Sequence, residues 1–314
     1  MKNLDFLIIG AQKCATTTLF EQLRAHPDIA MPLEKEVPFF NSPNATEEEW
    51  QSFSDQHFGE ADGRLWGKAT PQYLSDPYAA RRIATLMPEV KLVVILRDPI
   101  ERSWSHYRMD RRRGTEQRPF DEVIRGLLEP ETAQNNRYLP IPRHEQGFES
   151  ESAFHVAWSE YGRALAPYTA QFPKEQLLVL YLEDLASKPE ETLDRLLAFL
   201  DLETGFRPPA LGKVVHAGGS KNRIPHGARV WLRERALVRH LWQAMPDDRK
   251  GRLRFLYERW NGAGSTNDET PGLPQDLHAE LVAHFASDLR QLLARGITPP
   301  PWVQRYVAAS GAAY

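Results

Sequence analysis

The feature that most constrains the fold is a short apolar run that ends in a glycine and leads into a helical pattern. Phe6 to Ile9 is uniformly apolar, which is typical of a strand buried on both faces of a parallel sheet. After Gly10, apolar residues recur at helical spacing from Thr16 until Pro27 stops the pattern. The opening unit is therefore predicted to be a strand, a tight loop and a helix.

The same order of strand and helix recurs further along the chain. Apolar runs at 92–96 and 177–181 are each followed by a helical pattern, and Ser187 to Glu190 is predicted to cap the second of these helices. Such alternation implies an α/β domain in which helices flank a central parallel sheet. Apolar residues at helical spacing from Leu277 to Leu293 predict a C-terminal helix packed back on that domain.

Composition and charge exclude several classes of protein. The 314 residues are 41% hydrophobic and 26% charged, so the chain can bury a sizeable core, and we expect a single domain over 1–314. A net charge of −3 gives no general attraction to nucleic acid or membranes. The lone cysteine, Cys14, cannot close an intramolecular disulfide, and no apolar run reaches the roughly 18 residues that span a bilayer. We expect a cytoplasmic protein with no integral membrane segment and no nucleic-acid partner; its oligomeric state stays open.

The loop between the first strand and the first helix suits an anion. Backbone N–H groups at a helix N-terminus lack intrahelical partners, and the helix dipole adds partial positive charge. Lys13 adds a full charge, and Thr16, Thr17 and Thr18 add hydroxyl donors. The loop is not a Walker A motif, because Lys13 lies too close to Gly10 and is separated from the threonines. A polar turn with a threonine cap and an exposed lysine is the alternative for this segment alone.

Gly10-Ala11-Gln12-Lys13-Cys14-Ala15-Thr16-Thr17-Thr18 resembles the 5′-phosphosulfate loop of sulfotransferases that use 3′-phosphoadenosine 5′-phosphosulfate (PAPS). It is most similar to the carbohydrate, heparan-type branch and its bacterial relatives. The resemblance implies a P-loop-like three-layer domain, with a cofactor site that includes Lys13, Ala15 and the three threonines. Ala15 stands where that branch usually has glycine, so the backbone approach to the phosphate is expected to differ slightly.

A second motif follows the second apolar run. Arg97-Asp98-Pro99 and Ser105 resemble the family's 3′-phosphate motif, which implies that Arg97 and Ser105 bind that phosphate. An arginine at a strand end offers a planar fork for a phosphate, and a serine in the next helix can donate its hydroxyl to the same group. Taken alone, the motif also fits a helix-entry turn with a local ion pair. The motif follows the first loop in the same order as in the family, and each of the two follows a predicted strand. This joint occurrence favours a role in phosphate binding.

A third segment resembles the family's late loop, which closes over the cofactor's phosphates. In Ser220-Lys221-Asn222-Arg223, Lys221 and Arg223 would supply charge, while Ser220 and Asn222 suit a turn that presents backbone donors. A basic surface turn is the alternative. The three matches lie within about residues 4–223, and the C-terminal helical portion, about 224–306, resembles the family only loosely.

The expected general base comes from another segment. Lys35-Glu36 followed by Phe39-Phe40 resembles the part of the carbohydrate branch whose glutamate is the proposed base, which implies that role for Glu36. We expect Val37 and the two phenylalanines to desolvate the carboxylate and raise its pKa toward neutrality, as base catalysis at neutral pH requires. Surface charge above packed phenylalanines is the alternative.

The segment from Gly67 to Tyr73 resembles a family segment whose lysine lies close to the sulfonate and the acceptor. The resemblance implies a catalytic and substrate-binding role for Lys68, and a place for Tyr73 on the wall of the acceptor site. The sequence departs from the family pattern at Gly67, where that branch often has glutamate, and at Thr70, where the hydroxyl is shifted by one position.

The identity of the general base and the role of an arginine cluster each have an alternative interpretation. Histidine is the base in the small-molecule branch of the superfamily, so His106 and His216 compete with Glu36, although His106 is expected to be a packing or surface residue. Arg108 and the arginines at 111–113 form either a solvated helix end or a positive rim that attracts an anionic donor or acceptor.

Together the resemblances imply a PAPS-dependent O-sulfotransferase. The enzyme would transfer a sulfuryl group to a hydroxyl of a glycan, a glycolipid or a glycosylated metabolite, with Lys13 stabilising the leaving phosphate and Glu36 as base. No metal is expected, because lysines and arginines supply the charge. A PAPS-binding sensor or scaffold without turnover is one alternative, and a nucleotide kinase is disfavoured by the missing Walker spacing. The acceptor stays unidentified, since the stretches 41–66, 114–160 and 224–275 carry no recognisable chemistry.

Overall fold

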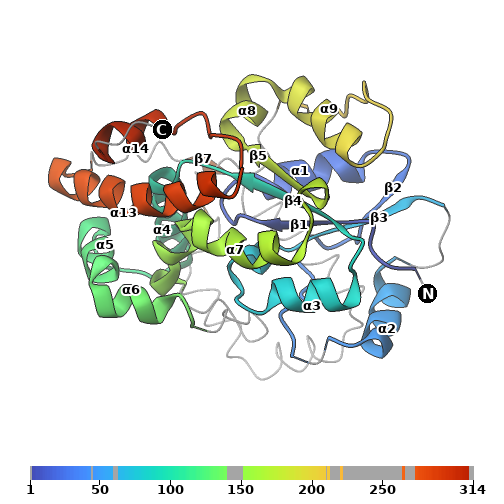
Figure 1. Ribbon diagram of the computed structural model, residues 1–314, viewed down its shortest axis with the longest axis horizontal. Helices are drawn as coiled ribbons and strands as arrows, with labels where there is room; N and C mark the ends of the chain where they lie inside the picture. The colour runs from blue at the N-terminus through green and yellow to red at the C-terminus, as the bar shows by residue number, and fades with distance from the viewer. Residues whose placement is uncertain are drawn as a thin grey trace.

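A five-stranded parallel sheet forms the centre of the molecule (Figure 1). The computed structural model describes residues 2–43, 45–58, 63–139, 151–209, 211–212, 220–221, 264–265 and 273–310. The order across the sheet is β2-β3-β1-β4-β5. Its strands are β1 (Phe6–Gly10), β2 (Ile29–Ala30), β3 (Leu65–Ala69), β4 (Lys91–Leu96) and β5 (Leu177–Tyr181).

The three apolar runs form β1, β4 and β5, which confirms the predicted central sheet. Every residue of β1 is buried, because β1 lies between β3 and β4 and helices cover both faces of the sheet. Parallel pairing sends the chain back through a crossover helix after each strand, and it places the loops that follow β1 and β4 at one edge of the sheet.

Helices complete the three layers. In Figure 1, α8 and α9 lie above the strands, α3 and α7 lie below them, and α4, α5, α6, α13 and α14 gather at the left of the view. The α-helices are α1 (Thr16–Arg24), α2 (Glu47–His57), α3 (Ala79–Leu86), α4 (Pro99–Arg113), α5 (Phe120–Leu128), α6 (Pro130–Asn136), α7 (Tyr161–Gln171), α8 (Leu182–Ser187), α9 (Pro189–Phe199), α13 (Gln275–Ala294) and α14 (Gln304–Ser310). Short 3₁₀ helices are η1 (Pro71–Ser75), η3 (Ser152–Phe154), η4 (Ala157–Ser159) and η5 (Lys174–Gln176). None of the helices in these described ranges is long and apolar enough to cross a membrane.

The predicted cap of the helix after β5 is wrong in detail. Ser187 is the last residue of α8, and its hydroxyl donates to the carbonyl oxygen of Glu183 instead of capping the next helix. The N-cap of α9 is Lys188, whose side chain makes no capping hydrogen bond, and Pro189 occupies the first turn. The predicted helix itself is present as α9, with Leu193, Leu196 and Leu197 buried. The short helix α8 precedes it as a separate element, because Pro189 cannot continue α8.

The expected C-terminal helix is α13, which packs on α7 across an unusually close contact. A Cβ added to Gly162 would lie 2.1 Å from the carbonyl oxygen of Asp288, so only glycine fits at this point. The Asp288 carboxylate accepts hydrogen bonds from the N–H groups of Gly162 (2.7 Å) and Arg163 (2.8 Å). Asp288 thereby caps the N-terminus of α7 from another helix and fixes α13 against the sheet layer.

The contact between α7 and α13 makes a prediction about two glycines. We expect Gly162→Ala to lower the free energy of unfolding by about 1–3 kcal/mol, because the added methyl group collides with the backbone of α13. Gly126→Ala, in α5, is the matched control: a Cβ there meets nothing within 4 Å, so better helix propensity should raise stability by up to about 1 kcal/mol. Urea unfolding measures both changes, and equal stability of the two variants would contradict the packing of α7 on α13.

Candidate active site

The phosphate loop, residues 11–15, connects the end of β1 to the start of α1. Its last residue, Ala15, is the N-cap of α1 and adopts the left-handed conformation with φ 62° and ψ 23°. Glycine adopts this conformation at no steric cost, whereas alanine does so less readily, which explains the preference for glycine in the family loop that this segment resembles. The first-turn N–H groups of α1 point toward the loop, as at any helix N-terminus, and no side chain caps them.

The three threonines do not contribute equally to this surface. Thr16 and Thr18 are buried, and Thr17 is partly exposed. The alternative interpretation of this segment, a turn capped by a threonine, does not hold, because the N-cap is Ala15.

Lys13 is half-buried and points toward α4. It also has a positive φ of 72°, and its Nζ lies 3.6 Å from the Sδ of Met109. Burial, and then the positive charges of Arg112 and Arg113, lower the pKa of Lys13 to about 7. The negative charges of Glu151 and Glu36 oppose this shift. Arg112 and Arg113, at the end of the arginine cluster, therefore add positive charge near the phosphate loop. This effect supports the interpretation of the cluster as a positive rim.

Arg97 lies at the edge of the sheet where β4 ends, and Ser105 lies in the helix that follows, α4. Arg97 directly follows β4, and the end of β4 is joined to the phosphate loop by a hydrogen bond from the N–H of Ala11 to the carbonyl oxygen of Ile95 (2.8 Å). Ser105 is part-exposed on α4. The guanidinium of Arg97 donates to Glu101 at 3.1 Å, so the local ion pair considered as the alternative is present.

Lys68 and Tyr73 form a buried pair beneath the site. Nζ of Lys68 donates to Oγ1 of Thr70 (2.5 Å) and to the hydroxyl of Tyr73 (2.9 Å), and neither Lys68 nor Tyr73 is exposed. Burial holds the pKa of Lys68 well below its ordinary value, against the charge of Glu36. The hydroxyl of Tyr73 also accepts from the N–H groups of Phe39 (3.0 Å) and Phe40 (3.2 Å).

Tyr73 therefore does not line an acceptor site as expected. Its side chain is fully buried, and burial raises its pKa to about 12. The hydroxyl instead fastens the backbone at Phe39 and Phe40, which follow Glu36. Tyr73 is a positioning residue for that segment.

Glu36 lies near both lysines, but its environment differs from the expected one. Its carboxylate accepts from Nζ of Lys35 (2.6 Å) and Nε2 of Gln72 (3.3 Å), and the side chain is 45% exposed. Burial acts to raise the pKa of Glu36, but the charge and hydrogen bond of Lys35 and the hydrogen bond of Gln72 outweigh it and lower the pKa. The prediction of a raised pKa is wrong, because Lys35 and Gln72 together stabilise the ionised carboxylate more than burial destabilises it.

Behind the phosphate loop lies a buried carboxylate that the sequence did not reveal. Oε2 of Glu151 accepts from Nε2 of Gln12 (3.0 Å), Nε2 of His106 (2.8 Å) and Nη1 of Arg113 (3.5 Å). The Glu151 side chain is fully buried, so its charge is held among these donors and acts on Lys13. No motif surrounds Glu151, and only the tertiary structure brings it to Gln12.

His106 occupies the same polar network and is not accessible to an acceptor. It is fully buried between Arg102, whose Nη2 lies 3.2 Å from its Nδ1, and Glu151. Burial lowers its pKa well below the ordinary value, although the hydrogen bond to Glu151 acts in the opposite direction. Its position agrees with the expected packing role. The competing histidine, His216, lies outside the described residues.

One group of side chains in the described part of the chain has the composition of a metal site. The ligand atoms of His106, Asp110 and His155 lie within 4.8 Å of one another, and all three residues are buried. However, Nε2 of His155 is already 3.0 Å from Oδ2 of Asp110, and the guanidinium of Arg102 adds positive charge beside His106. We interpret the group as a hydrogen-bonded network that joins α4 to the segment before α7.

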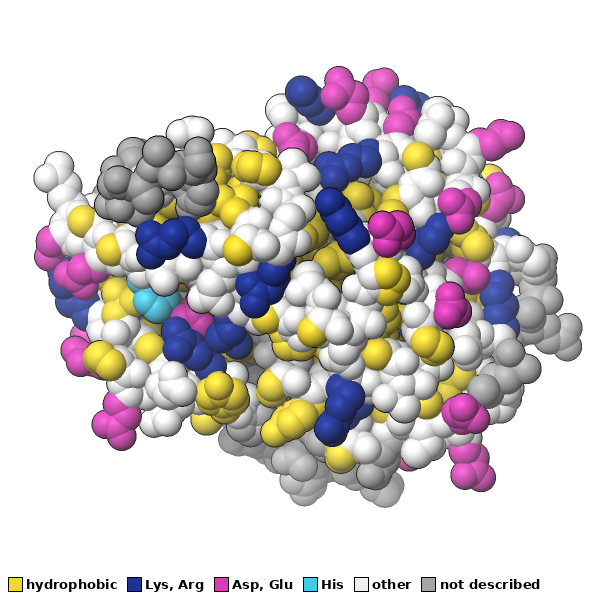
Figure 2. Space-filling model, viewed as in Figure 1, with side chains coloured by type: hydrophobic (Ala, Val, Ile, Leu, Met, Phe, Trp, Pro, Cys, Tyr) yellow, Lys and Arg dark blue, Asp and Glu magenta, His cyan; other side chains and the backbone are white. Residues whose placement is uncertain are grey.

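The late loop is described only in part. Ser220 and Lys221 form a short strand, β6, paired antiparallel with β7 (Gly264–Ser265), and Asn222 and Arg223 lie outside the described residues. On the face of the molecule in Figure 2, most acidic side chains lie toward the rim, whereas basic side chains also occupy the middle. This distribution agrees with a near-neutral chain that concentrates positive charge locally.

Comparison with known proteins identifies the family that these features fit. The model of the sulfotransferase domain matches residues 3–216. Membrane-associated sulfotransferase kil1 of Dictyostelium discoideum is 28% identical over 265 residues, covering 63% of this chain and 56% of that protein. Heparan sulfate glucosamine 3-O-sulfotransferase 3A1 of Mus musculus is 28% identical over 205 residues, covering 63% of this chain and 45% of that protein. The chain thus spans about half the length of these curated relatives.

A solved structure has a similar fold. The sulfotransferase from Alicyclobacillus acidocaldarius superposes with a TM-score of 0.62 at 23% sequence identity, covering 99% of this chain and 100% of that one. This likeness confirms the predicted α/β fold.

The surroundings of Lys13 make a prediction about its titration. In the protein without nucleotide, we expect its amine to titrate near pH 7, so that folding releases a proton between about pH 7 and the ordinary lysine range and stability rises with pH over that interval. The pH dependence of amine acylation at Lys13, followed by mass spectrometry, measures this pKa. Arg112→Met should raise it, whereas Arg290→Met, an exposed arginine on α13, should leave it unchanged. Titration of Lys13 in the ordinary lysine range would contradict the described environment.

Proposed function

The chain belongs to the sulfotransferase domain family, and from this premise we propose that it transfers a sulfuryl group from PAPS to an acceptor hydroxyl. The observation that carries the proposal is the convergence of two anion-binding motifs at one sheet edge. Lys13 follows β1, Arg97 follows β4, and the hydrogen bond from Ala11 to Ile95 joins the two strand ends. Donors at this edge suit a nucleotide with phosphates at both the 5′ and 3′ positions.

The proposed chemistry is a single in-line displacement at sulfur. The acceptor oxygen forms a new bond to sulfur while the bond from sulfur to the 5′-phosphate oxygen breaks, releasing 3′,5′-adenosine bisphosphate (PAP). Lys13 stabilises the negative charge that develops on that phosphate oxygen, and the first-turn N–H groups of α1 add their dipoles. Lys68 lies deeper, and its hydrogen bonds to Thr70 and Tyr73 hold it toward the Glu36 segment.

Glu36 is proposed to take the proton of the acceptor hydroxyl. Its lowered pKa means that the carboxylate is ionised at neutral pH and free of a proton before the acceptor binds. An anionic donor bound near Lys13 would raise the pKa of Glu36 by like-charge repulsion, which brings the carboxylate closer to the strength that base catalysis needs. The heparan sulfate relatives support a sugar hydroxyl as the acceptor.

A binding protein without turnover is the second candidate. The observations that favour it are the buried Lys68 and the ion pair of Glu36 with Lys35, since both catalytic candidates are engaged by the protein itself. Calorimetry with PAP, followed by incubation of labelled PAPS with a panel of glycan and small-molecule acceptors, separates the two candidates. PAP binding without label transfer to any acceptor would support the binding protein.

The proposed base makes a prediction that separates binding from chemistry. We expect Glu36→Gln to keep the PAP dissociation constant within about twofold and to lower kcat by about 100- to 10,000-fold, because the amide cannot accept the proton. Glu34→Gln is the matched control, since Glu34 is exposed two positions away and should retain full turnover. Lys13→Met should lower kcat as well, with a weaker affinity for PAP. Full activity of the Glu36→Gln protein would assign the base to another residue.

A further inference from the structure

The C-terminal segment that includes Trp302, Arg305 and Tyr306 docks on the start of α4. Nη1 of Arg305 donates to Oδ2 of Asp98 (2.7 Å), and the hydroxyl of Tyr306 donates to Oδ1 of Asp98 (3.0 Å). Asp98 is the residue after Arg97, and α14 lies more than 200 positions further along the chain. The segment also lies beyond residue 216, where the match to the family model ends.

Asp98 is a junction of local and distant hydrogen bonds. Its Oδ1 also accepts from the N–H groups of Ile100 (3.0 Å) and Glu101 (3.2 Å), so it caps the N-terminus of α4. The Asp98 side chain is only 5% exposed, and an almost fully buried carboxylate requires donors for both oxygens. Arg305 supplies the donor to Oδ2, while Tyr306 adds a distant donor to Oδ1.

Aromatic packing holds the same segment in place. The Trp302 ring packs edge-on against Tyr306 (5.6 Å between centroids) and Tyr181 (6.3 Å), and the hydroxyl of Tyr181 donates to the carbonyl oxygen of Thr298. Tyr181 ends β5, the strand beside β4. The segment is therefore fixed to the sheet independently of Asp98.

Tyr161 connects this aromatic group to both anion-binding motifs. Its hydroxyl lies 3.8 Å from Sγ of Cys14 in the phosphate loop. Burial raises the pKa of Tyr161 well above its ordinary value, and the nearby backbone of Arg97 acts in the opposite direction. Its ring lies 6.5 Å from the ring of Trp302. A chain of contacts thus runs from α14 through buried side chains to the residues on either side of the nucleotide site.

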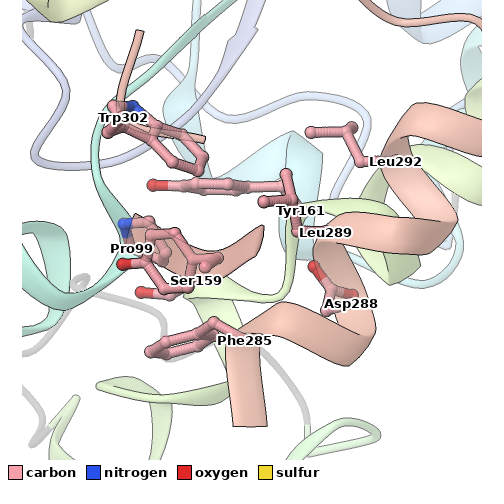
Figure 3. A pocket seen from close by; sticks show the side chains of 9 residues that line it. Pro99, Ser159, Tyr161, Phe285, Asp288, Leu289, Leu292 and Trp302 are labelled. Carbon is pink, nitrogen blue, oxygen red and sulfur yellow. The ribbon is translucent and has the colours of Figure 1, made fainter. Parts of the chain in front are cut away.

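The cavity in this region is too small to be a ligand site. Trp302, Tyr161, Pro99 and Ser159 come from different elements and lie close together (Figure 3). The cavity that they help to line has a volume of about 10 Å³. That volume holds about one water molecule. The small volume indicates that the C-terminal segment packs closely against the start of α4 and against α7 and α13.

We propose that Arg305 and Tyr306 are positioning residues for the 3′-phosphate site: by holding Asp98, they set the backbone at Arg97 and the first turn of α4 in the geometry that receives the phosphate. This inference rests on the proposed PAPS-dependent function. Burial and the charge of Asp98 both raise the pKa of Tyr306, so its hydroxyl stays protonated and remains a donor.

The test compares PAP with 5′-AMP, which lacks the 3′-phosphate. We expect Tyr306→Phe, which removes only the hydroxyl, to weaken PAP binding by about three- to tenfold and to leave 5′-AMP binding unchanged within about twofold. Arg305→Met should have the same selective effect, and Arg305→Lys should restore part of the loss. A merely structural role would weaken both nucleotides equally through reduced stability.

Two matched controls change the same side-chain types elsewhere. Tyr138→Phe alters an exposed tyrosine, and Arg295→Met alters an arginine that donates to the backbone of Gln291 in its own helix; both should bind PAP as the unmodified protein does. In an Arg97→Met background, Tyr306→Phe should cause no further loss of PAP affinity, because the group that it positions is gone. Independent additive losses in this double variant would overturn the inference.

The outcomes separate the inference from the proposed function. If the unmodified protein binds PAP no more tightly than 5′-AMP, recognition of the 3′-phosphate is wrong and the inference fails with it. If the unmodified protein discriminates and Tyr306→Phe keeps the full discrimination, only the role of the C-terminal segment is wrong. Hydrogen exchange at the amides of Ile100 and Glu101 gives a nucleotide-independent measurement, and we expect faster exchange in Tyr306→Phe.

Discussion

The hydrogen bond from the N–H of Ala11 to the carbonyl oxygen of Ile95 joins the ends of two parallel strands, and the geometry of the site depends on it. Parallel pairing of β1 with β4 places both following loops at one edge, but pairing alone does not set how closely the loops approach. This bond extends the pairing into the first residue of the phosphate loop. Lys13 and Arg97 are consequently held by the rigid sheet, which lowers the entropy lost when an anion is bound.

The parts of the fold that could be predicted were those encoded in contiguous residues. The run Phe6–Ile9 is apolar because both faces of β1 are covered, and that reason is visible in the sequence itself. The cap expected at Ser187 failed because Ser187 ends a separate short helix, α8, which the sequence analysis did not predict. The left-handed conformation of Ala15 could be inferred only through the glycine that the resembling loops carry there.

The candidate site was predictable in its members but less so in its electrostatics. Resemblance to family motifs predicted Lys13, Arg97 and Glu36 as members of one site. The lowered pKa of Glu36, however, depends on Lys35 beside it in the sequence and on Gln72, which approaches from η1. Glu151 could not be predicted, since its donors come from the phosphate loop and α4, which are distant in the sequence. The sequence motif identifies which side chains can react, whereas their contacts in the tertiary structure set their pKa values.

The placement of charged groups explains why a bound polyanion would stabilise the candidate site. Arg112 and Arg113 act together on a half-buried Lys13, and the repulsion among these groups is part of what lowers its pKa. The charge of Glu151 opposes this shift but does not cancel it. An anion placed at the phosphate loop would restore the proton of Lys13 and relieve that repulsion at once. Binding at this edge is therefore coupled to proton uptake, and the affinity for a phosphate should fall as pH rises above the pKa of Lys13.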